Sequence, residues 1–304
     1  MTKKTKISKP RRIKRSREDL IFDIFNYTIC FALLIIILYP MYFVIIASFS
    51  DPNAVAMGKV DFWIKGFNVK GYKALFQYED LWIGYKNTII YTVVGTVLSL
   101  IVNLPAGYVL TRRDIFGRKL IKTFFMIPMF FGGGMIPTYL AIKNYGMLDT
   151  IWAIVLPGAA VIYYIIVART YFETSIPEDL WEAAQVDGIG NLGYFIKIVI
   201  PLSKAIIAVI ALWTAVGHWN SYMNALLYLS DPDKRPLQLV LRTILVNSQT
   251  SSSMLTGAAA SEARELAELI KYSSIIVSSV PIMAMYPFVQ KYFNEGVMIG
   301  SVKG

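Results

Sequence analysis

Residues 175–201 read Ser-Ile-Pro-Glu-Asp-Leu-Trp-Glu-Ala-Ala-Gln-Val-Asp-Gly-Ile-Gly-Asn-Leu-Gly-Tyr-Phe-Ile-Lys-Ile-Val-Ile-Pro, a stretch whose polar first half lies between two strongly apolar segments. Ser175 and Glu178 have the spacing of a capping box, which satisfies free backbone N–H groups at a helix start. Pro177 suits a first helical turn, because a missing N–H costs nothing there. The stretch therefore predicts a short helix that begins near Ser175.

The predicted helix has one thin face without a partner. Gly188 and Gly190 can end the helix, because glycine readily adopts the left-handed backbone conformation. Helical spacing places four residues on one face: Leu180, Ala183, Ala184 and Asp187. The two alanines allow another surface to approach closely, and a short helix between two membrane spans cannot bury this face alone. We therefore expect a partner protein to dock here.

The same stretch resembles the EAA loop of binding-protein-dependent ABC importer permeases. The match is carried by Glu182, Ala183, Ala184, Gly188, Ile198 and Pro201. In that family the loop is the coupling helix, which docks into a cleft of a cytoplasmic ATPase and transmits ATP-driven closure to the membrane. The resemblance implies that the ATPase-coupling residues are Glu182, Ala183, Ala184, Asp187 and Gly188. The tripeptide alone also suits an ordinary surface helix, so the spacing and the position between late spans carry the match.

The composition is that of a membrane protein. Of the 304 residues, 56% are hydrophobic and 16% are charged, and the mean hydropathy is +0.51. The single cysteine, Cys30, allows no disulfide within the chain, and with one histidine there is no Cys/His cluster of metal-binding spacing. The sequence has no Gly-x-x-x-x-Gly-Lys-Ser/Thr phosphate loop. Any use of ATP therefore requires another chain.

Several apolar stretches are each close to the roughly 20 residues that cross a bilayer. We expect six spans, at residues 27–49, 87–111, 122–142, 151–172, 196–217 and 272–292. The chain then divides into a basic tail at 1–26, a transmembrane domain at 27–292 and a tail at 293–304. The expected fold class is an all-α membrane protein, and the resemblance makes it a type I ABC importer permease with a cytoplasmic coupling helix.

Charge predicts the orientation in the membrane. Basic residues gather before residue 20 and again in the loop at 112–122, and the positive-inside rule places both segments in the cytoplasm. An even number of spans then leaves both termini in the cytoplasm of a bacterial cell, with residues 173–195 inside. The outer loops are 50–86, 143–150 and 218–271. The net charge is +10, and the basic residues gather beside apolar spans. This distribution indicates contact with anionic membrane lipid rather than with nucleic acid.

The third expected span contains a glycine run. Gly132, Gly133 and Gly134 lie between Pro128 and Pro137, and such a run strongly weakens a helix. Non-helical backbone at membrane depth is tolerated where it lines a cavity or is buried in protein. We keep two interpretations open: a break that lines the substrate path, and a glycine face for close helix packing.

A second candidate for the substrate path follows the fifth expected span. Its residues are Trp219, Asn220, Tyr222 and Asn224. Aromatic faces stack on the C–H faces of sugars while amides bind hydroxyl groups, although an interfacial aromatic belt has the same composition. Further along, residues 246–271 suggest a short external helix capped near Ser261.

The C-terminal tail extends the resemblance. Residues 296–304 read Gly-Val-Met-Ile-Gly-Ser-Val-Lys-Gly, similar to the tail of carbohydrate permeases of the maltose-transporter type, which reaches into the ATPase dimer. The resemblance therefore implies that Val302, Lys303 and Gly304 contact the ATPase. It also implies the branch that carries complex oligosaccharides.

The resemblance implies a complete assembly. Its parts would be a second, related permease subunit, an ATPase dimer that binds ATP and Mg, and an extracellular solute-binding protein that delivers a saccharide, with no cofactor, metal or catalytic residue in this chain. Away from their ends the expected spans hold no ionisable residue, which argues against an ion-coupled carrier and against most enzymes. An ion-independent secondary carrier, a non-transporting membrane scaffold and an ABC permease for amino acids or inorganic ions remain as alternatives.

Overall fold

The computed structural model describes residues 16–254 and 256–301, which form helices and connecting loops and no strand. The chain divides into two compact units, residues 1–68 and 69–304. In the first unit, α1 (Arg17–Ser48) begins with the Ser16 hydroxyl accepting a hydrogen bond from the Glu18 N–H. The helix thus starts before residue 27, where the sequence placed the first span. The short α2 (Pro52–Ala56) follows, capped by the Asp51 side chain.

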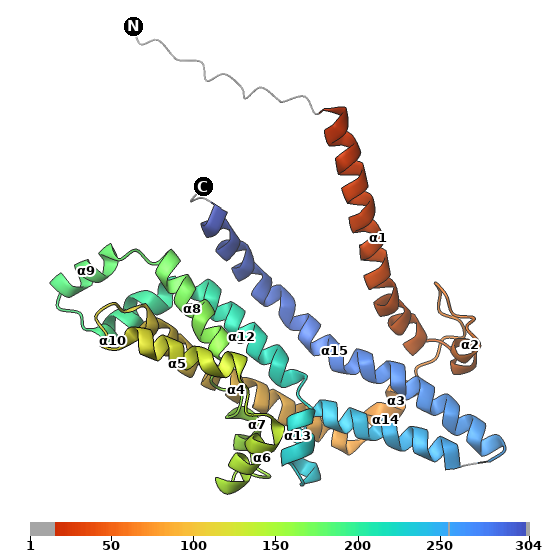
Figure 1. Ribbon diagram of the computed structural model, residues 1–304. Coiled ribbons are helices and arrows are strands. Elements are labelled where there is room, and N and C mark those ends of the chain that lie inside the picture. The colour runs from red at the N-terminus through yellow and green to blue at the C-terminus, as the bar shows by residue number, and fades with distance from the viewer. Residues whose placement is uncertain (1–15, 255, 302–304) are drawn as a thin grey trace. The chain divides into compact units, whose positions relative to one another are not determined.

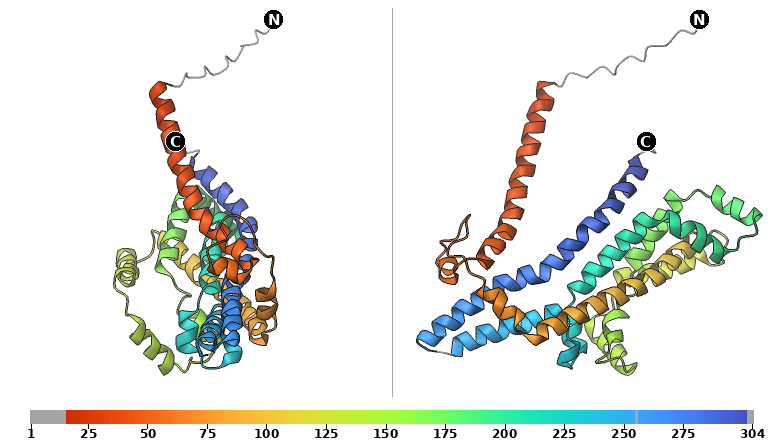
Figure 2. Two further views of the ribbon diagram at one scale, coloured as in Figure 1. Left: turned by 90° about the vertical axis from the view of Figure 1, so that its right-hand side faces the viewer. Right: turned by 180° about the vertical axis from the view of Figure 1, so that it is seen from behind.

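The second unit is built around three packed helices. The long α4 (Glu79–Thr111) packs against α8 (Ile162–Ser175) and against α12 (Lys204–Trp219). Figures 1 and 2 show α4 alongside both helices. The other helices of the unit are α3 (Lys70–Phe76), α5 (Arg118–Phe130), α6 (Met135–Asn144), α7 (Ile151–Val155), α9 (Asp179–Val186), α10 (Asn191–Tyr194), α11 (Ile200–Leu202), α13 (Met223–Tyr228), α14 (Leu237–Met254) and α15 (Ala258–Ser301).

Several of the expected spans are bent or divided. Within the described residues, α1, α4 and the 259–287 part of α15 are long and apolar enough to cross a membrane. Two further spans arise if bent pairs count as one span each: α5 with α6, bent by 112°, and residues 191–202 with α12, bent by 82°. The expected span at 151–172 is divided into α7 and α8 around Pro157 and Gly158, since proline removes a backbone donor and glycine weakens a helix.

Asn103 of α4 holds the break between α7 and α8. Its fully buried amide donates to the carbonyl of Ala159 at 2.8 Å and accepts from the N–H of Val161 at 2.9 Å. The same Nδ2 lies 2.8 Å from the Ser99 hydroxyl, which in turn lies 3.2 Å from the hydroxyl of Thr214 on α12. Asn103 therefore satisfies the broken backbone, as apolar surroundings require, and Ser99 extends the link from α4 to α12.

Glycines allow these helices to approach closely. A Cβ added to Gly107 of α4 would lie 2.9 Å from the Cβ of Ala168 on α8. A Cβ added to Gly95 would overlap with Nε2 of His218 on α12. Small residues at crossing points are the usual means of packing helices in membranes.

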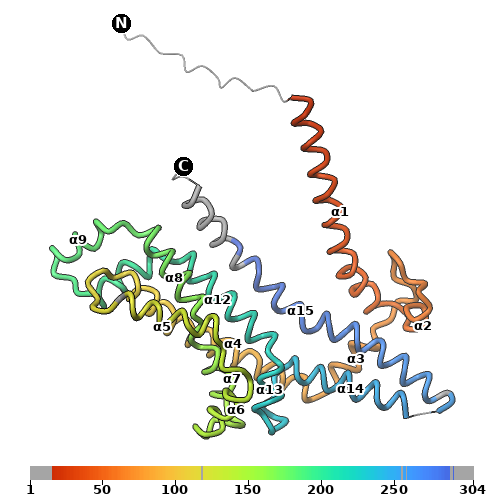
Figure 3. Tube along the Cα trace, viewed as in Figure 1, coloured from red at the N-terminus to blue at the C-terminus, as the bar shows by residue number. Residues whose placement is uncertain are grey.

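The helices α14 and α15 form a hairpin, which Figure 3 traces. The hairpin is tied to α4 by two hydrogen bonds: the Leu237 N–H donates to the Thr88 hydroxyl at 2.8 Å, and the Tyr85 hydroxyl donates to the Val277 carbonyl at 2.6 Å. The predicted helix start near Ser261 is wrong, because α15 already begins at Ala258. The alanine- and glutamate-rich segment consists of good helix formers, so it continues into the apolar span instead of ending before it.

The loop before α14 is also fixed to α4. The hydroxyl of Tyr91 donates to the Lys234 carbonyl at 2.7 Å. The ammonium of Lys234 lies 3.2 Å from carboxylate oxygens of both Asp149 and Asp231. The backbone N–H of Asp231, together with Lys234, holds the pKa of the Asp149 carboxyl below its ordinary value. Asp149 and Asp231 are therefore both already paired with a cation, Lys234.

We predict that Asn103→Leu lowers the stability of the protein. The substitution leaves the Ala159 carbonyl and the Val161 N–H without a partner, which costs about 1–3 kcal/mol. The measurement is the thermal unfolding midpoint in detergent. Thr96→Val is the matched control, because the buried Thr96 hydroxyl makes no hydrogen bond to any described residue. Its midpoint should be unchanged or higher, and equal losses in both variants would contradict the role of Asn103.

Candidate functional site

The short helix predicted in the 175–201 stretch exists as α9, but it begins later than expected. Ser175 is the last residue of α8, and Glu178, at the N-cap of α9, makes no side-chain capping bond. The reason is Pro177, which disfavours helical backbone at the preceding residue, so Ile176 is extended and α8 ends there. The end of α9 is as predicted at Gly188, which has φ +74°, whereas Gly190 has φ −73° and is not left-handed.

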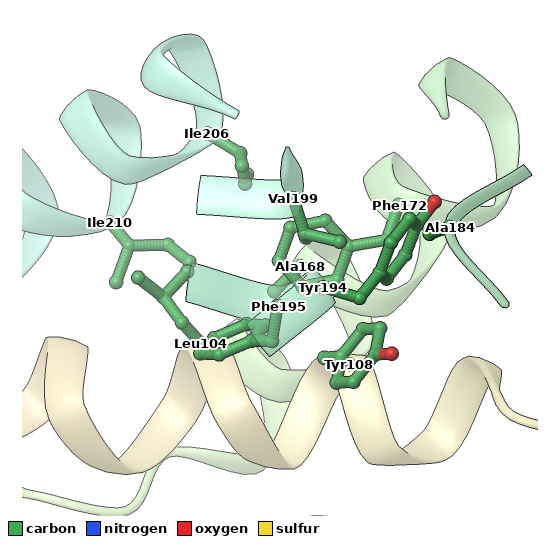
Figure 4. Close-up of a cluster of buried hydrophobic side chains, with 10 residues drawn as sticks. All are labelled: Leu104, Tyr108, Ala168, Phe172, Ala184, Tyr194, Phe195, Val199, Ile206 and Ile210. Atoms are coloured by element: carbon green, nitrogen blue, oxygen red, sulfur yellow. The ribbon is translucent and has the colours of Figure 1, made fainter. Parts of the chain in front are cut away.

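One of the five predicted coupling residues attaches α9 to the bundle. Ala184 is 3% exposed and joins a buried apolar cluster drawn from α4, α8, α12 and the helical residues 194–199. Figure 4 shows Ala184 at one end of this cluster, beside Phe172 and Tyr194. The other four, Glu182, Ala183, Asp187 and Gly188, are exposed. The helix is therefore fixed on one side and free to be contacted on the other.

Two arginines after α4 make the remaining attachments. The guanidinium of Arg112 lies 3.9 Å from the ring centre of Trp181 on α9. The same indole packs edge-on against Tyr194 at 5.0 Å. Arg113 forms a more exposed ion pair with Glu178 at 3.2 Å. Sequence reasoning used these arginines only for membrane orientation, and no local signal indicated that Arg112 and Trp181 meet.

A cavity of about 530 Å³ lies between α9 and the ends of α4 and α8. Its lining includes Tyr108, Thr111, Arg112, Glu173, Glu178 and Trp181. The attachment of α9 thus depends on a few side chains rather than on continuous packing. The side chains that line this cavity come from α9, from α8 and from the end of α4.

The glycine run between α5 and α6 is a break, in keeping with one of the two interpretations. The two helices meet at 112° across residues 131–134. A Cβ added to Gly132, Gly133 or Gly134 would meet no atom within 4 Å, so these glycines do not serve close packing within this chain. Large apolar side chains beside the break are exposed: Phe130, Phe131, Met135 and Ile136. A role in the substrate path stays a prediction.

The second group of predicted path residues is divided by the structure. Trp219 is 4% exposed, and its indole N–H donates to the Ser278 carbonyl at 2.9 Å, so this side chain packs between helices. Asn220 and Tyr222 are exposed, and Asn224 is half-buried. The predicted tail contacts Val302, Lys303 and Gly304 lie outside the described residues.

Comparison with known proteins identifies the family. The family model described as "Binding-protein-dependent transport system inner membrane component" matches residues 81–299, which include α8, α9, α12 and all but the first two residues of α4. The chain belongs to this family. As a binding-protein-dependent permease it is a multi-pass membrane component without catalysis of its own, and ATP hydrolysis takes place on a separate ATPase chain.

The chain is similar over nearly its whole length to named permeases and to a solved structure. It is 37% identical to the polygalacturonan/rhamnogalacturonan transport system permease YtcP of Bacillus subtilis (strain 168), over 94% of this chain and 100% of that protein. It is 28% identical to the maltodextrin permease MdxG of the same organism, over 95% and 99%. A bacterial ABC transporter involved in importing the acidic polysaccharide alginate matches with a TM-score of 0.82 and 33% identity, over 92% and 99%.

We predict that Arg112→Gln loosens α9 without unfolding the permease. A largely desolvated cation–π contact contributes up to about 2 kcal/mol, and the Arg112 side chain is only 15% exposed. Amide hydrogen exchange in residues 179–187 should therefore accelerate about tenfold. Arg113→Gln is the matched control, because its ion pair is exposed and such pairs contribute little. Equal acceleration in both variants would contradict the anchoring role of Arg112.

Proposed function

We propose that this permease is one of two different membrane subunits of an ATP-driven importer for a saccharide, in particular an oligosaccharide. An extracellular solute-binding protein delivers the saccharide, and an ATPase dimer binds ATP and Mg. The observation that carries the proposal is the similarity, over nearly the whole chain, to permeases named for polygalacturonan and maltodextrin transport and to an alginate importer.

The proposed coupling runs through α9. Its exposed residues Glu182, Ala183, Asp187 and Gly188 dock on the ATPase, and the C-terminal tail adds a second contact. ATP-driven closure of the ATPase dimer moves α9, and the membrane helices change from inward- to outward-facing. A partner shifts such an equilibrium only by binding the two states unequally, and the ATP-bound ATPase dimer supplies that difference.

The contacts behind α9 support this path. Trp181 meets Arg112 at the end of α4, and Ala184 meets the apolar cluster shared by α4, α8 and α12. Asn103 and Gly107 join α4 to its neighbours further along the same helix. A displacement of α9 therefore acts on a bundle whose helices are fastened to one another, rather than on one loose loop.

The proposed orientation places both termini in the cytoplasm. The ion pair between Arg113 and Glu178 brings the basic 112–122 loop and the α9 segment together, which supports their assignment to one side. The positive-inside rule makes that side cytoplasmic. The loops near α2 and α14 then face outward, where they receive the binding protein, and the saccharide passes the glycine break and the exposed residues after α12.

The test is saccharide uptake by cells that carry Glu182→Ala or Gly188→Arg in place of the native permease. We expect both variants to insert normally and to lose at least about tenfold in uptake, since even a modest interface loss of 1.4 kcal/mol is tenfold. Gly190→Ala is the matched control, because Gly190 has a φ that any residue adopts and open space around it. Unchanged uptake in both α9 variants would overturn the coupling assignment.

A further inference from the structure

Four polar side chains gather beyond the end of α12. Asn220 ends that helix, and its amide donates to the Val216 carbonyl at 3.0 Å. The amide of Gln238, on α14, lies 3.5 Å from the Asn220 side-chain oxygen. Arg242 follows one helical turn later on α14, and its guanidinium lies 5.7 Å from the ring centre of Tyr222. Two separate segments thus bring together an arginine, an aromatic ring and two amides.

The charge of Arg242 has no carboxylate in this arrangement. Arg242 is exposed and forms no ion pair with another described residue, in contrast to Arg113 and Lys234. Two acidic side chains nearby, Asp149 and Asp231, already share Lys234, and Asp233 of the same loop forms no ion pair with Arg242. The guanidinium therefore keeps most of its five N–H donors, and the Tyr222 side chain beside it is 37% exposed.

This set of groups suits a sugar acid better than a neutral sugar. A guanidinium binds a carboxylate through two parallel hydrogen bonds. An aromatic face packs on the C–H face of a pyranose ring, and side-chain amides bind its hydroxyl groups. A neutral saccharide uses the ring and the amides but leaves the arginine charge without a counterpart.

We propose that Tyr222, Arg242, Asn220 and Gln238 form a binding site for a saccharide that carries carboxylate groups. This inference rests on the proposed function and narrows it to a substrate class. A carboxylate on the surface of a binding protein would also pair with Arg242, so the test below includes stimulation of the ATPase by the empty binding protein. Polygalacturonan, a polymer of a sugar acid, and the acidic polysaccharide alginate are the ligands named for two relatives.

The experiment uses the complete importer in liposomes, with its binding protein and ATPase. The probes are trisaccharides of galacturonate and of mannuronate, each compared with its carboxyl-reduced, neutral form. We expect the wild type to transport at least one acidic probe, and Arg242→Gln to lower that uptake about tenfold, since a charged hydrogen-bonded pair contributes on that scale. Uptake of any neutral probe should be unchanged. Arg264→Gln is the matched control, an exposed arginine on α15 without an ion pair to any described residue.

A second variant, Tyr222→Leu, tests the aromatic ring separately from the charge of Arg242. Tyr222→Leu retains the charge and removes the ring, and it should lower uptake of the acidic probe severalfold. Equal effects of Arg242→Gln and Arg264→Gln would overturn the site, as would equal losses of acidic and neutral uptake. The proposal would also be overturned if Arg242→Gln lowered the stimulation of the ATPase by the empty binding protein as much as it lowered uptake of the acidic probe. Arg242 would then contact the binding protein.

The two proposals fail in different ways. Transport of neutral probes alone would overturn the acidic substrate class and leave the saccharide importer standing. Transport of neither kind of saccharide by the wild-type assembly would overturn both.

Discussion

A broken helix in a membrane must satisfy its free backbone groups within the protein, and in this permease Asn103 meets that requirement. One buried amide binds the carbonyl of Ala159 and the N–H of Val161, on the segment between α7 and α8. Water is not available at that depth to replace these bonds, so the break is tolerated only while α4 stays beside it. The hydrogen-bonded Ser99 and Thr214 extend the same link to α12. The packing of α4, α8 and α12 therefore depends on the hydrogen-bonded side chains of Asn103, Ser99 and Thr214.

The packed helices in turn define where α9 lies. The glycine at 107 lets α4 and α8 approach closely, and the two helices end near each other on the side where α9 follows. Arg112 and Trp181 then fasten α9 from one direction, and Ala184 fastens it from another. A few side chains at the ends of packed helices suffice to transmit a displacement, because close-packed helices move as bodies rather than deform. This arrangement gives a physical reason for the proposed control of the membrane helices by α9.

The sequence predicted elements better than it predicted contacts. Hydropathy and length located the apolar segments, and the glycine run at 132–134 correctly indicated a break, because these signals are local. The start of α9 was wrong, since the capping pattern at Ser175 competes with the restriction that Pro177 places on Ile176, and the proline prevails. Trp219 was assigned to the substrate path because it belongs to a group of aromatic and amide residues after the fifth expected span. Its burial against α15 depends on packing between segments that are distant in the sequence. The contact of Arg112 with Trp181 could not be predicted for the same reason.

The central claim is that the exposed side of α9 contacts an ATPase, and site-specific cross-linking tests it most directly. Val186 is 88% exposed on α9, and Val186→Cys can carry a photo-cross-linker once the native Cys30 is replaced by serine. Met254, 77% exposed at the far end of α14, provides the control position. The account predicts an adduct between Val186→Cys and an ATPase chain in native membranes, and none from Met254→Cys. A Val186→Cys protein that forms no ATPase adduct, in membranes where the assembled transporter is active, would contradict the account.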